Sequence, residues 1–148
     1  MNQPALGGSL IALLAVACLL QSGCRRAPST PEADKIVTRH FQSVSKEDYP
    51  SAAADYAARF FQKTSREDLI GKFTTTKTVL GSYKSHLIFG RQQFQDAREY
   101  GAGTVAVLQC QTTYANYPAW ERFTLLKIPG DAEYKIVDHS IQSEGFMK

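Results

Sequence analysis

The stretch "GTVAVLQCQTTYANYPAWERFTLLKIPGDAEYKIVDHSI", residues 103–141, decides the fold of this chain. Within it, apolar and polar residues alternate with a period of two, which is the pattern of β-strands that bury one face. Asn-Tyr-Pro and Pro-Gly-Asp interrupt the alternation and mark two turns. The stretch therefore predicts three strands, at 103–114, 119–128 and 133–141. The loops between them are short, which favours an antiparallel meander.

A further strand is expected just upstream, where "SYKSHLIFGRQQFQ" occupies residues 82–95. Gly90 interrupts its alternation, so we expect a β-bulge at this point. With the meander, this gives an antiparallel sheet of about four strands.

Helical spacing replaces the two-residue period between residues 31 and 80. Thr30, followed by Pro31, predicts the start of a first helix that ends near residues 45–48. Pro50 opens a second, alanine-rich helix over "SAAADYAARFFQ". Ser65 and Asp68 form the pattern of a capping box for a third helix, which ends before Gly81. Helices followed by a meander predict an α+β domain in which the N-terminal helices pack on one face of the sheet.

Three segments, "SKEDYPSAAADYAARFFQ", "VLGSYKS" and "EYKIVDHSIQSE", together resemble the small bacterial nuclear transport factor 2-like (cystatin-like) domains. The resemblance extends over nearly the whole chain after residue 30. It implies a curved sheet wrapped around the helices to form a cone with a pocket. It implies no particular chemistry, because one fold hosts enzymes, binding proteins and scaffolds.

The N-terminal stretch "SLIALLAVACLLQSGCRRAPST", residues 9–30, predicts a location. Its uncharged run is shorter than the roughly 20 residues that a membrane span needs, and has the length of a signal-peptide core. Small residues then precede Cys24, as in the lipobox of bacterial lipoproteins, where the cysteine receives a diacylglycerol. Cys18, after Ala17, is the alternative site of lipidation.

The expected organisation is a lipoprotein-type signal peptide at 1–23, a tether at 24–30 that begins with the lipidated cysteine, and one α+β domain at 31–148. This predicts a lipid-anchored, palmitate-bearing protein of the bacterial cell envelope that faces the periplasm. The alternative is an inner-membrane anchor, with Arg25 and Arg26 on the cytoplasmic side.

Composition excludes several classes of function. Of 17 basic residues, Arg25 and Arg26 belong to the tether, which leaves 15 against 14 acidic residues and gives no electrostatic reason to bind nucleic acid. The sequence has no CxxC, HExxH or clustered Cys/His pattern, so no metal site is expected. It also has no GxGxxG or P-loop, and we expect no cofactor.

Counting by twos assigns one face of each strand to the core. This inner face is predicted to hold Ala106, Leu108, Cys110, Thr112, Tyr114, Glu121, Phe123, Leu125, Val137, His139 and Ile141. Four of these are the candidate pocket residues: Thr112, Tyr114, Glu121 and His139. A carboxylate among apolar walls has a raised pKa and could move a proton. Alternatively, Tyr114 and Glu121 reach water at the strand ends, and His139 is a hydrogen-bonded core residue.

Two further features allow two interpretations each. Cys110 is expected to be a small buried residue rather than a reactive thiol, which would need a nearby positive charge. In "YANYPAW", Tyr114 and Trp120 could pack across the hairpin. Alternatively, Tyr117 and Trp120 form an exposed aromatic tip that contacts a partner protein or a glycan.

We therefore expect a binding or envelope-assembly module, not an enzyme, attached to the membrane by its lipid and with a protein partner in the envelope. One alternative is a small pocket enzyme of isomerase or dehydratase type that uses Glu121 and His139. The other is an inhibitor of a periplasmic hydrolase, acting through the hairpin.

Overall fold

The computed structural model describes residues 30–96 and 98–148, and the predictions for Cys18 and Cys24 lie outside them. The helical elements are α1 (Pro31–Ser45), α2 (Tyr49–Ala54), the 3₁₀ turn η1 (Phe60–Gln62), α3 (Arg66–Leu80) and the C-terminal turn η2 (Glu144–Met147). The strands are β1 (Tyr83–Asp96), β2 (Gly103–Tyr114), β3 (Pro118–Lys127) and β4 (Lys135–Gln142).

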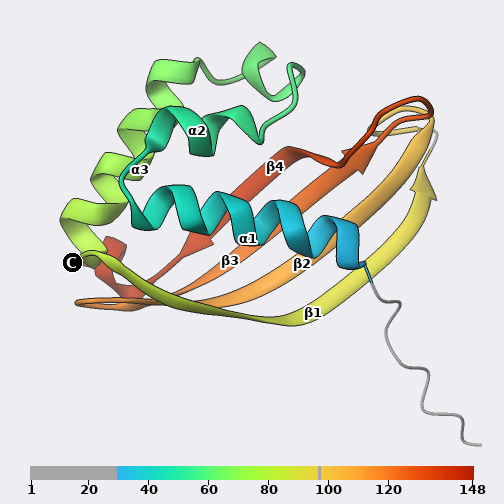
Figure 1. Ribbon diagram of the computed structural model, residues 1–148. Helices are drawn as coiled ribbons and strands as arrows, with labels where there is room; N and C mark the ends of the chain where they lie inside the picture. Colours follow the sequence, from blue (N-terminus) through green and yellow to red (C-terminus); the bar gives the residue numbers. More distant parts are fainter. Residues whose placement is uncertain (1–29, 97) are drawn as a thin grey trace, which may run out of the picture.

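The strands form one antiparallel sheet in the order β1-β2-β3-β4. The sheet is curved, and Figure 1 shows α1 lying over its concave face, with α2 and α3 toward one end. This confirms the predicted α+β architecture, with N-terminal helices packed on a four-stranded sheet. None of the helices in the described ranges has the length and apolar content that a membrane crossing requires.

The ends of α3 follow the local signals. The Ser65 hydroxyl oxygen accepts a hydrogen bond from the backbone N–H of Asp68 at 3.0 Å, as the capping pattern predicts. Gly81 ends the helix with a φ of 86°, a value that favours glycine. At the start of α1, by contrast, the Thr30 hydroxyl donates to the Asp34 carboxylate and caps no backbone N–H.

The prediction of one helix over residues 51–62 is wrong. The helix α2 ends at Ala54, because the chain then pairs with the end of the sheet as a short parallel bridge. The N–H of Ile136 donates to the carbonyl of Asp55 at 2.9 Å, and the N–H of Ala57 donates to the carbonyl of Ile136 at 2.8 Å. These tertiary hydrogen bonds outweigh the helix preference of the alanines. They leave Tyr56 on the sheet and not on a helix.

The register of the sheet shifts at three places: twice in β1, between Tyr83 and Ser85 and between Ile88 and Gly90, and once in β4. In β1, Ile88 pairs with Cys110 and Gly90 with Gln109, so the extra residue is Phe89, next to the glycine where a bulge was expected.

In β4, Asp138 pairs with Thr124 while Ile136 pairs with Leu125, and Val137 is the extra residue. Val137 therefore lies in the outer cluster with Val105, Val107 and Leu126, and Ile136 takes the core position. The predicted core position of Val137 is wrong for this reason.

The main core lies between α1 and the concave face of the sheet. Its largest fully buried side chains include Phe41, Leu108, Phe123, Leu125 and Ile136. Polar residues occupy this face toward the end of the sheet that α3 covers.

Candidate functional site

Four side chains form a continuous hydrogen-bonded chain on the concave face. Glu121, on β3, is 3% exposed. Its Oε1 accepts a hydrogen bond from the Tyr114 hydroxyl at 2.8 Å, and its Oε2 lies 2.8 Å from His139 Nε2. His139 Nδ1 lies 2.7 Å from the Tyr56 hydroxyl. We call these four hydrogen-bonded side chains, Tyr56–His139–Glu121–Tyr114, the polar network.

The pKa directions define the protonation of the carboxyl group and the two phenols of this network. Burial raises the pKa of Glu121, but the hydrogen bond and charge of His139, and then the hydroxyls of Tyr114 and Thr112, outweigh it, so that the pKa lies below its usual value. The raised pKa that the sequence predicted for this carboxylate is therefore wrong. Burial, and then the charge of Glu121, raise the pKa of both Tyr56 and Tyr114. The carboxylate is therefore ionised and both phenols keep their protons. The His139 ring bridges these groups, with Nε2 against the carboxylate and Nδ1 against the Tyr56 hydroxyl.

A second histidine lies against this network. His40, on α1, is 1% exposed, and its ring centroid is 5.7 Å from that of His139. Burial, and then the neighbouring His139, lower the pKa of His40 to about 3, which keeps the ring neutral. Its Nδ1 is buried and has no hydrogen-bond partner within the described ranges. Such an unpaired group costs about 1–3 kcal/mol, an unusual feature in a core.

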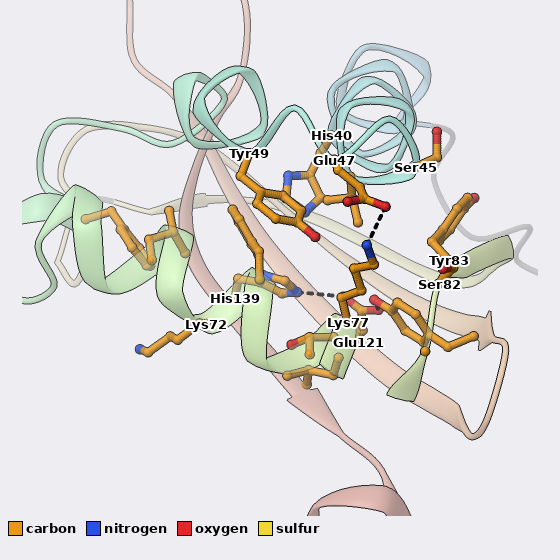
Figure 2. A pocket seen from close by; sticks show the side chains of 18 residues that line it. His40, Ser45, Glu47, Tyr49, Lys72, Lys77, Ser82, Tyr83, Glu121 and His139 are labelled. Atoms are coloured by element: carbon orange, nitrogen blue, oxygen red, sulfur yellow. Dashed lines mark hydrogen bonds and ion pairs between the residues drawn. The ribbon is translucent and has the colours of Figure 1, made fainter. Parts of the chain in front are cut away.

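Three members of the polar network, Tyr114, Glu121 and His139, line a pocket between α1, α3 and the end of the sheet, whereas Tyr56 lies outside it. The cavity measures about 80 Å³, several times the roughly 10–15 Å³ that one water needs. Figure 2 shows Glu121 and His139 at its floor, with Tyr49 and Tyr83 around it. Its apolar walls include Val44, Tyr49, Phe60, Leu69, Phe73 and Ile141.

An ion pair lies at the mouth of this pocket. Lys77 Nζ, on α3, is 2.6 Å from Glu47 Oε1, in the turn after α1, and both side chains are about half exposed. Figure 2 draws this pair above the Glu121 carboxylate. Glu47 has a φ of 58°, the left-handed region that few residues other than glycine adopt. The turn is thus held in an unfavourable conformation where the pocket opens.

The structure brings together three of the four candidate pocket residues, Tyr114, Glu121 and His139. Thr112 lies on the same face but is fully buried and does not line the pocket. Its hydroxyl has no hydrogen-bond partner of normal geometry in the described part of the chain, but it lies close enough to Glu121 to help lower the pKa of that carboxyl. In the described ranges, no group of three or more His, Cys, Asp or Glu side chains could hold a metal ion.

Cys110 is fully buried, as the first of its two interpretations predicts. Burial, and then the charge of Glu121, raise the pKa of its thiol to about 12. The thiolate form that a nucleophile requires is therefore disfavoured.

The hairpin after β2 differs from both of its interpretations. Trp120 pairs with Gln111 and points to the outer face, whereas Tyr114 points inward to Glu121, so the predicted Tyr114–Trp120 packing is wrong. Tyr117 is partly buried against Leu80, so Tyr117 and Trp120 do not form one exposed tip. Trp120 is 54% exposed and contacts Phe89 instead.

Sequence reasoning missed Tyr56 and His40 as members of the site. His40 was recognisable as a polar residue at an apolar helical position, beside Ile36, Val37 and Phe41. Tyr56 has no such signal, because it reaches His139 across 83 residues of chain.

A scan against models of protein families finds no match to this chain, and a search of curated proteins also finds none. The geometry of the pocket therefore has to support the functional argument.

Proposed function

We propose that this domain binds a small, mainly apolar molecule that presents a hydroxyl or ammonium group to Glu121. The observation that supports this most directly is an ionised, buried carboxylate at the floor of an apolar pocket. A carboxylate has about four acceptor positions, and Tyr114 and His139 use one each. A ligand that donates a hydrogen bond can occupy a remaining position. Small-molecule sites commonly combine apolar walls with a few polar groups in this way.

The cellular setting belongs to the same proposal. A lipid on Cys24 would hold the domain on the periplasmic side of the bacterial envelope, where it acts as a binding module. The pocket between helices and a curved sheet is what the nuclear transport factor 2-like resemblance implies, and it supports that resemblance. Partnership with an envelope protein stays a prediction of this proposal.

Binding is tested with three probes of similar size: benzylamine, phenol and toluene. With the full-length chain in detergent, we expect benzylamine and phenol at about 10 mM to raise the Tm, as binding to the native state must. Toluene, which cannot donate to Glu121, should raise it less. Glu121→Gln should remove the preference for benzylamine, while Glu67→Gln, at an exposed carboxylate on α3, should retain it.

If no probe changes the Tm, or if Glu121→Gln responds like the unmodified chain, the proposal is wrong. Val44→Trp gives a second test that leaves Glu121 in place. It puts a larger side chain into the pocket wall, and it should abolish the response to all three probes.

The polar network also favours a second candidate function, proton transfer catalysed by Glu121. A hydrogen-bonded carboxylate, histidine and tyrosine in an apolar pocket are suited to general acid–base catalysis. Binding stands first because a carboxylate with a lowered pKa is a weak base. The test is the ring opening of 5-nitrobenzisoxazole, in which the base removes the ring C–H proton and the N–O bond breaks. Catalysis that is lost in Glu121→Gln and kept in Glu67→Gln would favour the enzyme. If the unmodified chain reacts no faster than Glu121→Gln, proton transfer by Glu121 is eliminated.

The anchor is tested by feeding an alkyne-tagged palmitate to bacteria that express the chain. We expect Cys24→Ser to lose the label and Cys18→Ser to keep it. Loss only in Cys18→Ser would move the site to Cys18, and a label that neither substitution removes would refute lipidation at both.

A further inference from the structure

The outer face of the sheet, opposite the helices, has an exposed pair of aromatic rings. Trp120 and Phe89 are 54% and 51% exposed. Their ring centroids lie 5.3 Å apart, with an angle of 88° between the planes. Phe89 is the extra residue of the β1 bulge, and the bulge therefore brings it to this face. The two rings thus stand at right angles to each other, and we call this pair, Phe89 and Trp120, the aromatic corner.

Side-chain amides surround this corner. In the sheet register, Gln111 lies between Leu87 and Trp120, and Gln142 lies on the far side of Trp120. Both glutamines are exposed.

A third exposed glutamine, Gln109, lies beside the corner. A Cβ added at Gly90 would lie 2.6 Å from its Oε1, so the amide lies over the glycine. Arg122, which pairs with Gln109, adds one charge. The corner thus has amide neighbours on both flanks, with one basic residue, Arg122, and one acidic residue, Glu144, near it.

These features fit the chemistry of a sugar ring. A pyranose ring has C–H bonds on its faces, which the negative face of an aromatic ring attracts. Its hydroxyls point outward from the ring edge, and each both donates and accepts. A glutamine amide also does both, whereas a charged side chain does only one. An uncharged glycan therefore matches the aromatic corner and its amide neighbours together.

A protein partner fits this surface less well. A stable protein interface uses roughly 20–30 residues a side. Here the exposed apolar side chains are Leu87, Phe89 and Trp120, with Phe146 and Met147 of the C-terminal turn beside Trp120. They are far fewer than such an interface uses, and the residues between Leu87 and Trp120 are polar. Sugars, by contrast, bind to small areas.

We propose that Trp120, Phe89, Gln109 and Gln111 form a binding surface for an uncharged pyranose glycan. This site is separate from the pocket and does not depend on the pocket's ligand.

The chain provides its own reporter, because Trp120 is its single tryptophan. The full-length chain in detergent is titrated with cellohexaose and with chitohexaose up to about 10 mM, a range that reveals even millimolar affinity. We expect a saturable change of tryptophan emission with at least one of the two. Phe89→Ala keeps the reporter and should weaken binding about tenfold, as truncation of an aromatic anchor does.

Phe94→Ala is the matched control. Phe94 is also an exposed phenylalanine of β1, and it pairs with Val105 at the other end of the outer face. It should leave the titration unchanged. Gln111→Leu, which removes the amide and preserves the size, should weaken binding. Trp120→Ala should abolish retention of the chain on cellulose and chitin beads.

Three results would overturn the proposal. The first is no change of emission with either oligosaccharide together with no retention on either kind of bead. The second is equal weakening by Phe89→Ala and Phe94→Ala. The third is a dimer in sedimentation that Trp120→Ala converts to a monomer without any glycan effect, which would make this face an interface between two copies.

Discussion

Replacement of Tyr114 by phenylalanine removes one hydroxyl group from the polar network and leaves the ring in place. That hydroxyl donates to Glu121 at 2.8 Å, and both residues are nearly inaccessible to solvent. A hydrogen bond to a charged group contributes about 1.5–3 kcal/mol, and a neutral one about 0.5–1.5 kcal/mol. Because Glu121 is ionised at neutral pH, we expect Tyr114→Phe to lower the free energy of unfolding by about 2 kcal/mol at pH 7, measured by urea denaturation.

The same substitution has a predictable pH dependence. The folded-state pKa of Glu121 lies below its usual 4.5, so its ionisation stabilises the fold above the unfolded-state pKa. This contribution is lost as the pH falls through the folded-state value. The cost of Tyr114→Phe should therefore decrease to about 1 kcal/mol once the carboxyl is protonated, since only a neutral hydrogen bond then remains.

Two controls separate this effect from a change in packing. Tyr134→Phe removes the hydroxyl of another buried tyrosine, one that bonds no described residue, and should cost less than about 0.5 kcal/mol. In a double-mutant cycle, Tyr114→Phe should cost about 1 kcal/mol less in a Glu121→Gln background. The prediction of an ionised Glu121 bound by Tyr114 is refuted if Tyr114→Phe lowers the free energy of unfolding equally in the unmodified chain and in Glu121→Gln. It is also refuted if the loss at pH 7 is no larger than the loss caused by Tyr134→Phe.

Three other predictions concern the surroundings of the pocket. In the native chain, Cys110→Ala should leave the number of thiols that react with Ellman's reagent unchanged, because Cys110 is buried and burial raises its pKa to about 12. In urea, the same substitution should lower that number by one. A lower number in the native variant would show that Cys110 is accessible. Lys77→Ala should lower the free energy of unfolding by less than about 1 kcal/mol, since the pair with Glu47 is half exposed, and about 1 M salt should reduce this effect; a larger, salt-independent loss would contradict it. Gly81→Ala should lower the free energy of unfolding by about 1–3 kcal/mol, because φ is 86° and the new Cβ would lie 2.8 Å from a neighbouring carbon. Gly71→Ala, in open space on α3, should raise it by about 1 kcal/mol. Equal denaturation midpoints for the two variants would refute this prediction.

Much of the architecture could be predicted from the sequence because its signals are local. Ser65 and Gly81 mark the two ends of α3 through the backbone geometry that each residue permits. The order of the strands follows from the short loops between β2, β3 and β4. The inward positions of β2 and β3 follow from their period of two, which nothing interrupts between Ala106 and Tyr114 or between Glu121 and Leu125.

Local signals also placed Tyr114, Glu121 and His139 on one face, but they could not supply the remaining partners. Tyr56 lies in an alanine-rich segment, and alanine has the strongest helix preference of all residues. The hydrogen bonds that hold it on the sheet join its neighbours Asp55 and Ala57 to Ile136, which lies 80 residues after Tyr56 in the chain. The burial of His40 could be predicted from its place on the apolar face of α1, but its contact with His139 required the packing of that helix on the sheet.

Two predictions from the sequence are wrong, the single helix over residues 51–62 and the regular alternation of β4, and both of these segments help to assemble the polar network. Ile136 and His139 are three residues apart, so simple alternation would put them on opposite faces, and the bulge at Val137 lets both face inward. Ile136 then holds the backbone on both sides of Tyr56, and the Tyr56 hydroxyl is hydrogen-bonded to His139 Nδ1. The helix that ends at Ala54 and the bulge at Val137 each depart from the local preference of the sequence. Together they place the buried polar network at a position that apolar side chains could have filled. Departures of this kind concentrate at functional sites, which is the physical reason for proposing that this domain uses the pocket to bind its ligand.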